Sequence, residues 1–131
     1  MEIFFEVKNS TGVITLNRPK ALNALNLNMA IQLSKKLKEW EDDNAVERVI
    51  LLGEGNHFCA GGDVKSVHLS GPFSELKREF FSKEYSLNLQ IKNFPKPYLS
   101  IWKGVVMGGG VGLSIYGDYR IATDSTKFAM P

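Results

Sequence analysis

Cysteine pairs, excess charge of one sign and long apolar runs are all missing from this sequence of 131 residues. The 16 basic and 14 acidic side chains leave a net charge of +2, which does not favour a nucleic-acid partner. The single cysteine, Cys59, excludes an intramolecular disulfide and fits a reducing compartment. No run of eighteen apolar residues occurs, and the amino terminus MEIFFEVKN lacks the layout of a signal or transit peptide. We therefore expect a soluble, cytoplasmic protein with no membrane or nucleic-acid partner.

What the chain does contain is an alternation of β-rich and helical patterns. Its 44% of apolar residues suffice for one domain with a sizeable core. We predict strands at 2–9, 13–18, 48–55, 98–102 and 119–123. The first two should form a hairpin across NSTG, because asparagine and glycine tolerate positive φ. Alternation of this kind predicts an α/β fold with right-handed crossovers.

Two helices are predicted between these strands. The first follows Asn26, a typical N-cap residue, and its apolar residues recur at steps of four and three. Those residues are Met29, Leu33, Leu37 and Trp40. The second spans residues 72–92 and ends at FPKP, where proline stops it. The apolar face of the first helix must pack on another element.

Two glycine-rich stretches, CAGGD at 59–63 and MGGGVG at 107–112, leave main chain uncovered. Each is predicted to follow a strand and to lie near a helix start, where backbone N–H groups lack intrahelical partners. Two such amides aimed at one point would form an oxyanion hole. Neither stretch has the spacing of a P-loop or a dinucleotide-binding motif. An isolated glycine run can also merely allow a helix to pack closely on a strand.

Three blocks carry a resemblance to a known family: NRPKALNAL, HFCAGGDVKSV and GVVMGGGVGLSIYGDYRIATDSTKFAMP. Together they resemble, in order and spacing, the crotonase (enoyl-CoA hydratase/isomerase) superfamily over essentially the whole chain. Within it, CAGGDVK, KEYSLN and KFAMP are most similar to the 3-hydroxyisobutyryl-CoA hydrolases. The resemblance implies a crotonase-like ββα spiral fold and an acyl-CoA thioester hydrolase. An enoyl-CoA hydratase or isomerase, and an inactive module that binds acyl-CoA, are the alternatives.

The resemblance also implies roles for individual residues. The amides of Gly62 and Gly109 would form the oxyanion hole, and Glu84 would contact the substrate. Ala60, Asp63 and Val64 would border the adenine and pantetheine of coenzyme A. Lys20, Ala21 and Leu22 would line the same groove, with Lys20 near phosphate. No metal and no cofactor beyond the substrate's coenzyme A is implied, and a homo-oligomer is expected.

One departure from the family pattern concerns the end of the sequence. The family's catalytic glutamate follows the proline of FAMP, and an aspartate in the hydrolases comes a few residues later, whereas this sequence stops at Pro131. We therefore expect residues 1–131 to form the amino-terminal part of a crotonase-like domain, truncated before the carboxy-terminal helices. Such a chain would bind acyl-CoA weakly, lack acid–base chemistry and tend to self-associate.

Several reactive side chains also have simpler interpretations. Cys59 lies between Phe58 and Ala60 and is more typical of a small buried hydrophobe than of a nucleophile. His57 and His68 have no spacing that indicates a metal or a catalytic triad. On residues alone, Asp63 is as typical of a helix cap as of a ligand contact. Glu84, near Lys83 and Arg78, is equally typical of a solvated helix face.

Overall fold

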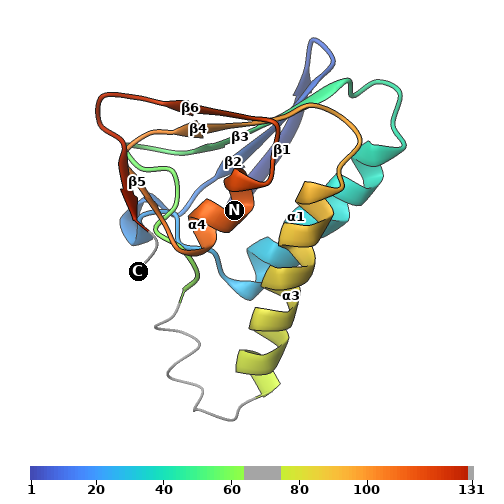
Figure 1. Ribbon diagram of the computed structural model, residues 1–131. Helices are drawn as coiled ribbons and strands as arrows, with labels where there is room; N and C mark the ends of the chain where they lie inside the picture. Colours follow the sequence, from blue (N-terminus) through green and yellow to red (C-terminus); the bar gives the residue numbers. More distant parts are fainter. Residues whose placement is uncertain (64–74, 130–131) are drawn as a thin grey trace.

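A five-stranded sheet is the frame of the structure (Figure 1), a computed structural model that describes residues 1–63 and 75–129. Its strands lie in the order β1-β2-β3-β4-β6. Their bounds are β1 Ile3–Lys8, β2 Thr11–Leu16, β3 Arg48–Gly53, β4 Tyr98–Trp102 and β6 Tyr119–Ala122. Only β1 and β2 pair antiparallel, and the other neighbours pair parallel. The mixed α/β class is as predicted, and every predicted strand is present.

The hairpin between β1 and β2 turns within NSTG, as predicted, and uses its asparagine but not its glycine. Asn9 and Ser10 carry the positive φ values, 50° and 65°, so glycine is not needed in the turn. Gly12 instead lies inside β2, where an added Cβ would come within 2.5 Å of the Trp40 ring. Its role is therefore to leave room for an aromatic side chain of the first helix.

Helix α1 (Leu27–Glu41) forms where the cap and the apolar periodicity predicted it. The Asn26 Oδ1 atom accepts a hydrogen bond of 2.8 Å from the Met29 amide, which satisfies one of the free N–H groups of the first turn. The predicted apolar face is fully buried. It belongs to one core cluster with Ile14, Leu16 and Leu51 of the sheet.

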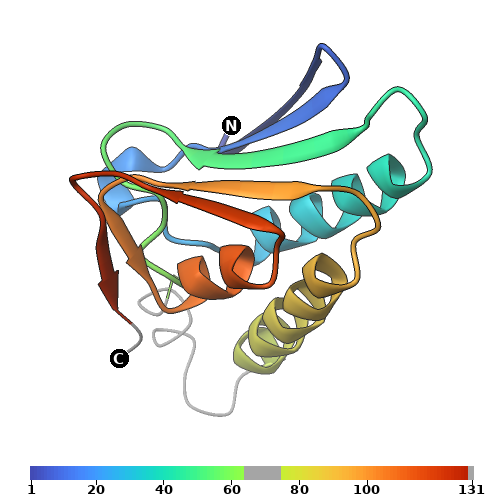
Figure 2. The same ribbon diagram turned by 45° about the horizontal axis from the view of Figure 1, so that its top comes forward.

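Helix α3 (Glu75–Lys92) lies against α1 on the same side of the sheet (Figure 2). Ser34 and Gln90 join the two helices, because the Ser34 hydroxyl bonds to Gln90 Oε1 at 2.7 Å. The helix contributes Phe80, Leu87 and Ile91 as buried side chains. The predicted start of this helix, 72–74, lies outside the described residues. None of the described helices is long and apolar enough to cross a membrane.

Two short strands and a 3-10 turn were not predicted, and a fourth short element, a helix, was predicted only by its start. Strand β5 (Val105–Met107) pairs parallel with β7 (Lys127–Ala129) in a separate two-stranded sheet. A single 3-10 turn, η1, covers Pro19–Ala21. Helix α4 (Gly109–Ile115) follows β5 directly and packs against α3. Together these elements surround the two glycine stretches.

Candidate functional site

The two glycine-rich stretches lie side by side in the structure. They begin at Cys59 and Met107, which are 48 positions apart in the sequence. Cys59 and Val106 form a parallel bridge, and the Met107 amide donates to the Cys59 carbonyl at 3.1 Å. A Cβ added to Gly109 would lie 3.1 Å from the Gly62 nitrogen. The main chains around Gly62 and Gly109 therefore touch, as two halves of one site would require.

The local setting agrees with the prediction for one of the two stretches and differs for the other. Residues 107–112 do follow a strand and open a helix, since β5 ends at Met107 and α4 begins at Gly109. Residues 59–63, however, follow β3 only after the loop 54–58. The prediction that they lead into a helix concerns residues outside the described ranges. Contact between main chains, rather than identical strand-to-helix turns, brings the glycines together.

A third segment, residues 22–25, runs beside residues 60–63. The Ala60 amide donates to the Leu22 carbonyl at 3.0 Å, and the Leu25 amide donates to the Gly61 carbonyl at 2.7 Å. The Asp63 amide in turn donates to the Leu25 carbonyl at 2.7 Å. These bonds fix the backbone on both sides of Gly62.

The predicted groove residues are consequently neighbours. Lys20 lies exposed on η1, followed by half-buried Ala21 and by Leu22, whose φ of 52° turns the chain toward residue 60. Ala60 and Asp63 are half-buried on the facing segment. Val64, the remaining predicted groove residue, lies outside the described residues.

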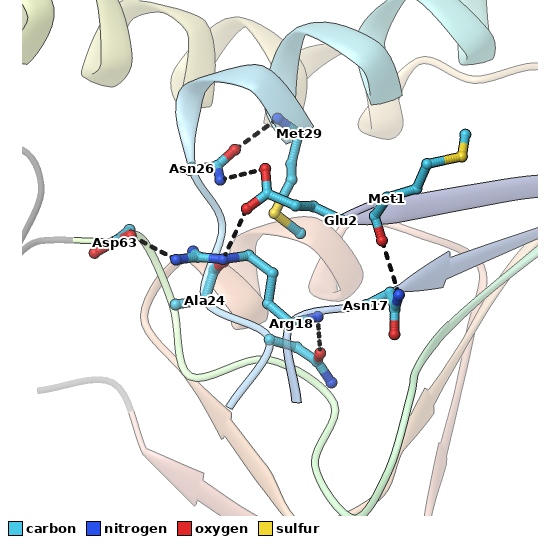
Figure 3. A network of polar contacts seen from close by, with 9 residues as sticks. Met1, Glu2, Asn17, Arg18, Ala24, Asn26, Met29 and Asp63 are labelled. Atoms are coloured by element: carbon cyan, nitrogen blue, oxygen red, sulfur yellow. Dashed lines mark hydrogen bonds and ion pairs between the residues drawn. The ribbon is translucent and has the colours of Figure 1, made fainter. Parts of the chain in front are cut away.

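Arg18 ties these segments together through a network of polar contacts (Figure 3). Its guanidinium donates to the Ala24 carbonyl at 2.7 Å and to the Asp63 carboxylate at 3.0 Å. A further ion pair of 3.2 Å joins it to Glu2, which also accepts from Asn26. The Asp63 carboxylate thus pairs with Arg18, and Arg18 connects the amino terminus, the 22–25 segment and the second half of the glycine loop.

Asn23 supports the same region from within the core. Its side chain is fully buried, and its Oδ1 accepts from the Arg18 amide at 2.8 Å. Its Nδ2 donates to the carbonyls of Glu54 and His57 at 3.0 and 2.7 Å. Arg18 and Asn23 were not predicted as site residues. An asparagine inside the apolar stretch ALNAL is the signal that could have indicated a buried, fully bonded polar group.

Glu84 carries the one carboxylate that faces both glycines among the described residues. Its Oε1 would lie 2.6 Å from a Cβ on Gly109, and its Oε2 3.7 Å from a Cβ on Gly62. The side chain is half-buried, and burial raises the pKa of its carboxyl group. Glu84 is therefore directed at the glycine pair and does not lie on a purely solvated helix face.

A cleft of about 670 Å³ opens from this point between α3 and α4. Glu84, Gly108 and Gly109 line one part of it, and Asn88 and Gly112 line the wall beside them. Most of its other wall is apolar or aromatic. Those residues are Phe81, Tyr85, Leu89, Val111, Ile115 and Tyr116. A mostly apolar cleft with a few polar groups is typical of a small-molecule site.

Cys59 and His57 have structural roles: Cys59 is part of the core, and His57 accepts a hydrogen bond from the backbone. Cys59 is fully buried, and burial, the largest cause, raises the pKa of its thiol to about 12. His57 Nδ1 accepts a hydrogen bond of 3.0 Å from the Val105 amide. In the described ranges, no three His, Cys, Asp or Glu side chains are grouped as metal ligands would be. His68 lies outside those ranges.

The sequence of the chain is similar to that of known proteins. A family model described as "Enoyl-CoA hydratase/isomerase" matches residues 11–131. The chain is 48% identical to a mitochondrial 3-hydroxyisobutyryl-CoA hydrolase from Danio rerio over 99% of its own length and 35% of the relative's. It therefore spans about a third of the length of that relative.

Solved structures also resemble the chain. A carnitinyl-CoA dehydratase from Mycobacterium thermoresistibile shares 44% identity with a TM-score of 0.95, covering 99% of this chain and 39% of that one. An enoyl-CoA hydratase from Rhodobacter sphaeroides 2.4.1 shares 37% identity with a TM-score of 0.95, covering 100% and 40%. The fold predicted from the sequence is the fold of these structures.

Proposed function

Because this chain belongs to the enoyl-CoA hydratase/isomerase (crotonase) family, we propose that it supplies the oxyanion hole and coenzyme A groove of an acyl-CoA thioester hydrolase. The acyl group we propose is of the 3-hydroxyisobutyryl type, in keeping with the name of the relative at 48% identity. The reaction needs no cofactor other than the coenzyme A that the substrate carries. The contact between the main chains of Gly62 and Gly109 supports this proposal best.

The chemistry explains why two uncovered amides matter. Attack of water on a thioester carbon converts the carbonyl oxygen into an oxyanion, which returns to a carbonyl when the thiolate leaves. Two fixed N–H donors stabilise that oxyanion, and removal of one such donor slows related reactions by about 10² to 10³. In this proposal the donors are the amides of Gly62 and Gly109. Their lack of a side chain is consistent with the role, because a Cβ on Gly109 would approach both the Gly62 nitrogen and the Glu84 carboxylate.

The remaining residues have complementary roles in the proposal. Glu84 contacts the acyl group at the entrance of the cleft. Ala60 and Asp63 border the coenzyme A arm on one side, and the exposed Lys20 pairs with its phosphate on the other. The carboxylates that exchange protons with water and substrate lie outside residues 1–131, as the resemblance implies. Full turnover is accordingly proposed for a longer protein that contains this chain.

A hydratase or dehydratase activity is the second candidate. Two structures with TM-scores of 0.95 carry the names carnitinyl-CoA dehydratase and enoyl-CoA hydratase. Their chemistry would use the same pair of amides, because the enolate of a thioester places its negative charge on the same oxygen. The two candidates therefore share the oxyanion hole and differ in the reaction that follows.

One assay separates the candidates. We would determine the intact masses of the 131-residue chain and of a longer protein that contains it, and then measure thiol release from 3-hydroxyisobutyryl-CoA beside hydration of crotonyl-CoA with each. The activity of the longer protein decides between the candidates. Thiol release without hydration supports the hydrolase, and hydration without thiol release supports the second candidate. The 131-residue chain by itself is expected to bind both ligands and turn over neither. Turnover by a species of that mass would show that the catalytic carboxylate lies within residues 1–131.

A further inference from the structure

Asn88 lies on α3 one helical turn after Glu84 and faces the backbone of α4. A Cβ added to Gly112 would come within 2.7 Å of the Asn88 Nδ2 atom and 2.9 Å of its Oδ1 atom. The Asn88 amide therefore lies directly against α4, at a place that only a glycine leaves open. Glu84 makes the equivalent approach to Gly109, one turn earlier on both helices.

The Asn88 oxygen has no hydrogen-bond partner among the described residues, although it is shielded from solvent. Buried carbonyl oxygens are nearly always bonded, because leaving one unsatisfied costs free energy. Asn23, a buried asparagine in the 22–25 segment, satisfies its amide with three protein partners. Ser100 Oγ, on β4, is also buried without a partner among the described residues, but of these two residues only Asn88 lines the cleft, where a ligand can complete its oxygen.

The place of this oxygen suggests which group of a ligand completes it. Asn88 and Gly112 line the cleft that also contains Glu84 and Gly109. Residues i and i+4 of a helix are separated by about 6 Å along its axis. An acyl chain whose carbonyl lies at the glycine pair would extend along this wall, so a donor a few bonds beyond the carbonyl would meet Asn88.

We propose that Asn88 is a specificity-determining residue that accepts a hydrogen bond from a hydroxyl group on the acyl chain of the bound thioester. The inference rests on the proposed function and adds the residue that distinguishes hydroxyacyl from plain acyl substrates. A hydroxyl is the donor we propose because it is neutral and the other residues of the cleft wall are mainly apolar or aromatic. A hydroxyl can also accept in return from the Asn88 Nδ2.

The test is a comparison of two ligands that differ by one oxygen atom. Affinities for 3-hydroxyisobutyryl-CoA and isobutyryl-CoA are measured by calorimetry on the full chain, and mass spectrometry verifies that each thioester remains intact. The unmodified protein should bind the hydroxy ligand about tenfold more tightly, which is the usual contribution of one hydrogen bond to an otherwise unsatisfied buried group. The measured quantity is the ratio of the two dissociation constants.

Two variants and one control test whether the preference for the hydroxy ligand depends on Asn88. Asn88→Leu, similar in size but without a polar atom, should lower the ratio to about one while isobutyryl-CoA binds at least as well as before. Asn88→Asp retains an acceptor oxygen and should retain a preference for the hydroxy ligand. Asn28→Leu, at an exposed position of α1, should leave the ratio unchanged. Thermal melts verify that each variant is folded.

The outcomes distinguish this inference from the function on which it rests. A ratio near ten that persists in Asn88→Leu would overturn the role of Asn88 and leave the proposed function intact. A ratio near one in the unmodified protein, with both ligands bound, would also overturn the role of Asn88 and leave the proposed function intact. Failure of the unmodified protein to bind either thioester would overturn the proposed function, and this inference with it. If Asn88→Leu does not fold, loss of the preference in Asn88→Asp would still contradict the acceptor role.

Discussion

At the scale of single residues, Glu84 carries an ionisable carboxyl group at a half-buried position. Its carboxylate faces Gly62 and Gly109, and burial raises its pKa. A carboxyl group whose pKa is higher in the folded than in the unfolded protein binds its proton more tightly when folded. The folded state is therefore favoured below the unfolded pKa and loses that advantage as the pH rises through the folded value.

This reasoning predicts a pH-dependent effect of Glu84→Gln. The neutral amide avoids the cost of burying a charge, so the variant should melt at a higher temperature than the unmodified protein at pH 7.5. The difference in Tm should shrink toward pH 4, where the glutamate itself is protonated. Glu79→Gln, at an exposed position of the same helix, is the matched control and should show no such trend. A Tm difference for Glu84→Gln that is equal at both pH values would contradict this account.

At the scale of elements, the site depends on three segments, two loops and strand β5, whose backbones are fixed to each other. Residues 22–25 and 60–63 run in parallel, and the Cys59 bridge to Val106 joins them to β5. Arg18 supports the assembly from one side through Ala24, Asp63 and Glu2. Because its side chain is only 21% exposed, these contacts are better protected from water than those of a surface arginine.

We predict that Arg18→Met destabilises the fold by about 2 kcal/mol, because it leaves two carboxylates without their shared partner. The Tm should fall by roughly 5–10 °C, measured by circular dichroism or calorimetry. Acyl-CoA affinity should fall as well, since the loop that carries Gly62 loses a restraint. Arg48→Met is the control: Arg48 also pairs with a glutamate, but its side chain is 46% exposed, so the loss should stay below about 1 kcal/mol. Equal losses of stability in both variants would contradict the proposed role of Arg18.

The elements also show what could be read from the sequence. Helix α1 was predictable because its cap and apolar spacing are local signals, and the long strands were predictable from their apolar runs. Strands β5 and β7 have three residues each, too few for a pattern, and form only because distant segments meet. The partners of Arg18 and Asn23 lie up to 45 residues away, so no local pattern identified them. The proximity of Glu84 to the glycines was implied by the family resemblance rather than by any spacing.

At the scale of the whole molecule, apolar side chains gather near one edge of the sheet. Strand β6 is the last strand of the described sheet, and its residues Tyr119 and Ile121 are 61% and 48% exposed. Nearby in the chain, Ile115, Tyr116 and Phe128 are also exposed large hydrophobics. An exposed edge strand with apolar side chains favours association with another chain.

We therefore predict that the 131-residue chain self-associates as its concentration rises, and that Ile121→Lys shifts it toward monomer. Sedimentation velocity over a hundredfold range of concentration measures both effects. Val7→Lys is the control, since Val7 is equally exposed, at 48%, on the opposite edge strand β1. A chain that stays monomeric throughout that range would contradict the prediction, as would equal effects of the two lysine variants.

In the proposed function, the amides of Gly62 and Gly109 hold the oxygen of a thioester carbonyl. The most direct measurement is a titration of the ¹⁵N-labelled chain by NMR, with 3-hydroxyisobutyryl-CoA in one series and free coenzyme A in the other. We predict that both ligands shift the amides of the 20–22 and 60–63 segments. Only the thioester should move the Gly62 and Gly109 amide protons strongly downfield, as new hydrogen bonds do. Binding of the thioester with those two resonances unchanged from the coenzyme A series would contradict the claim.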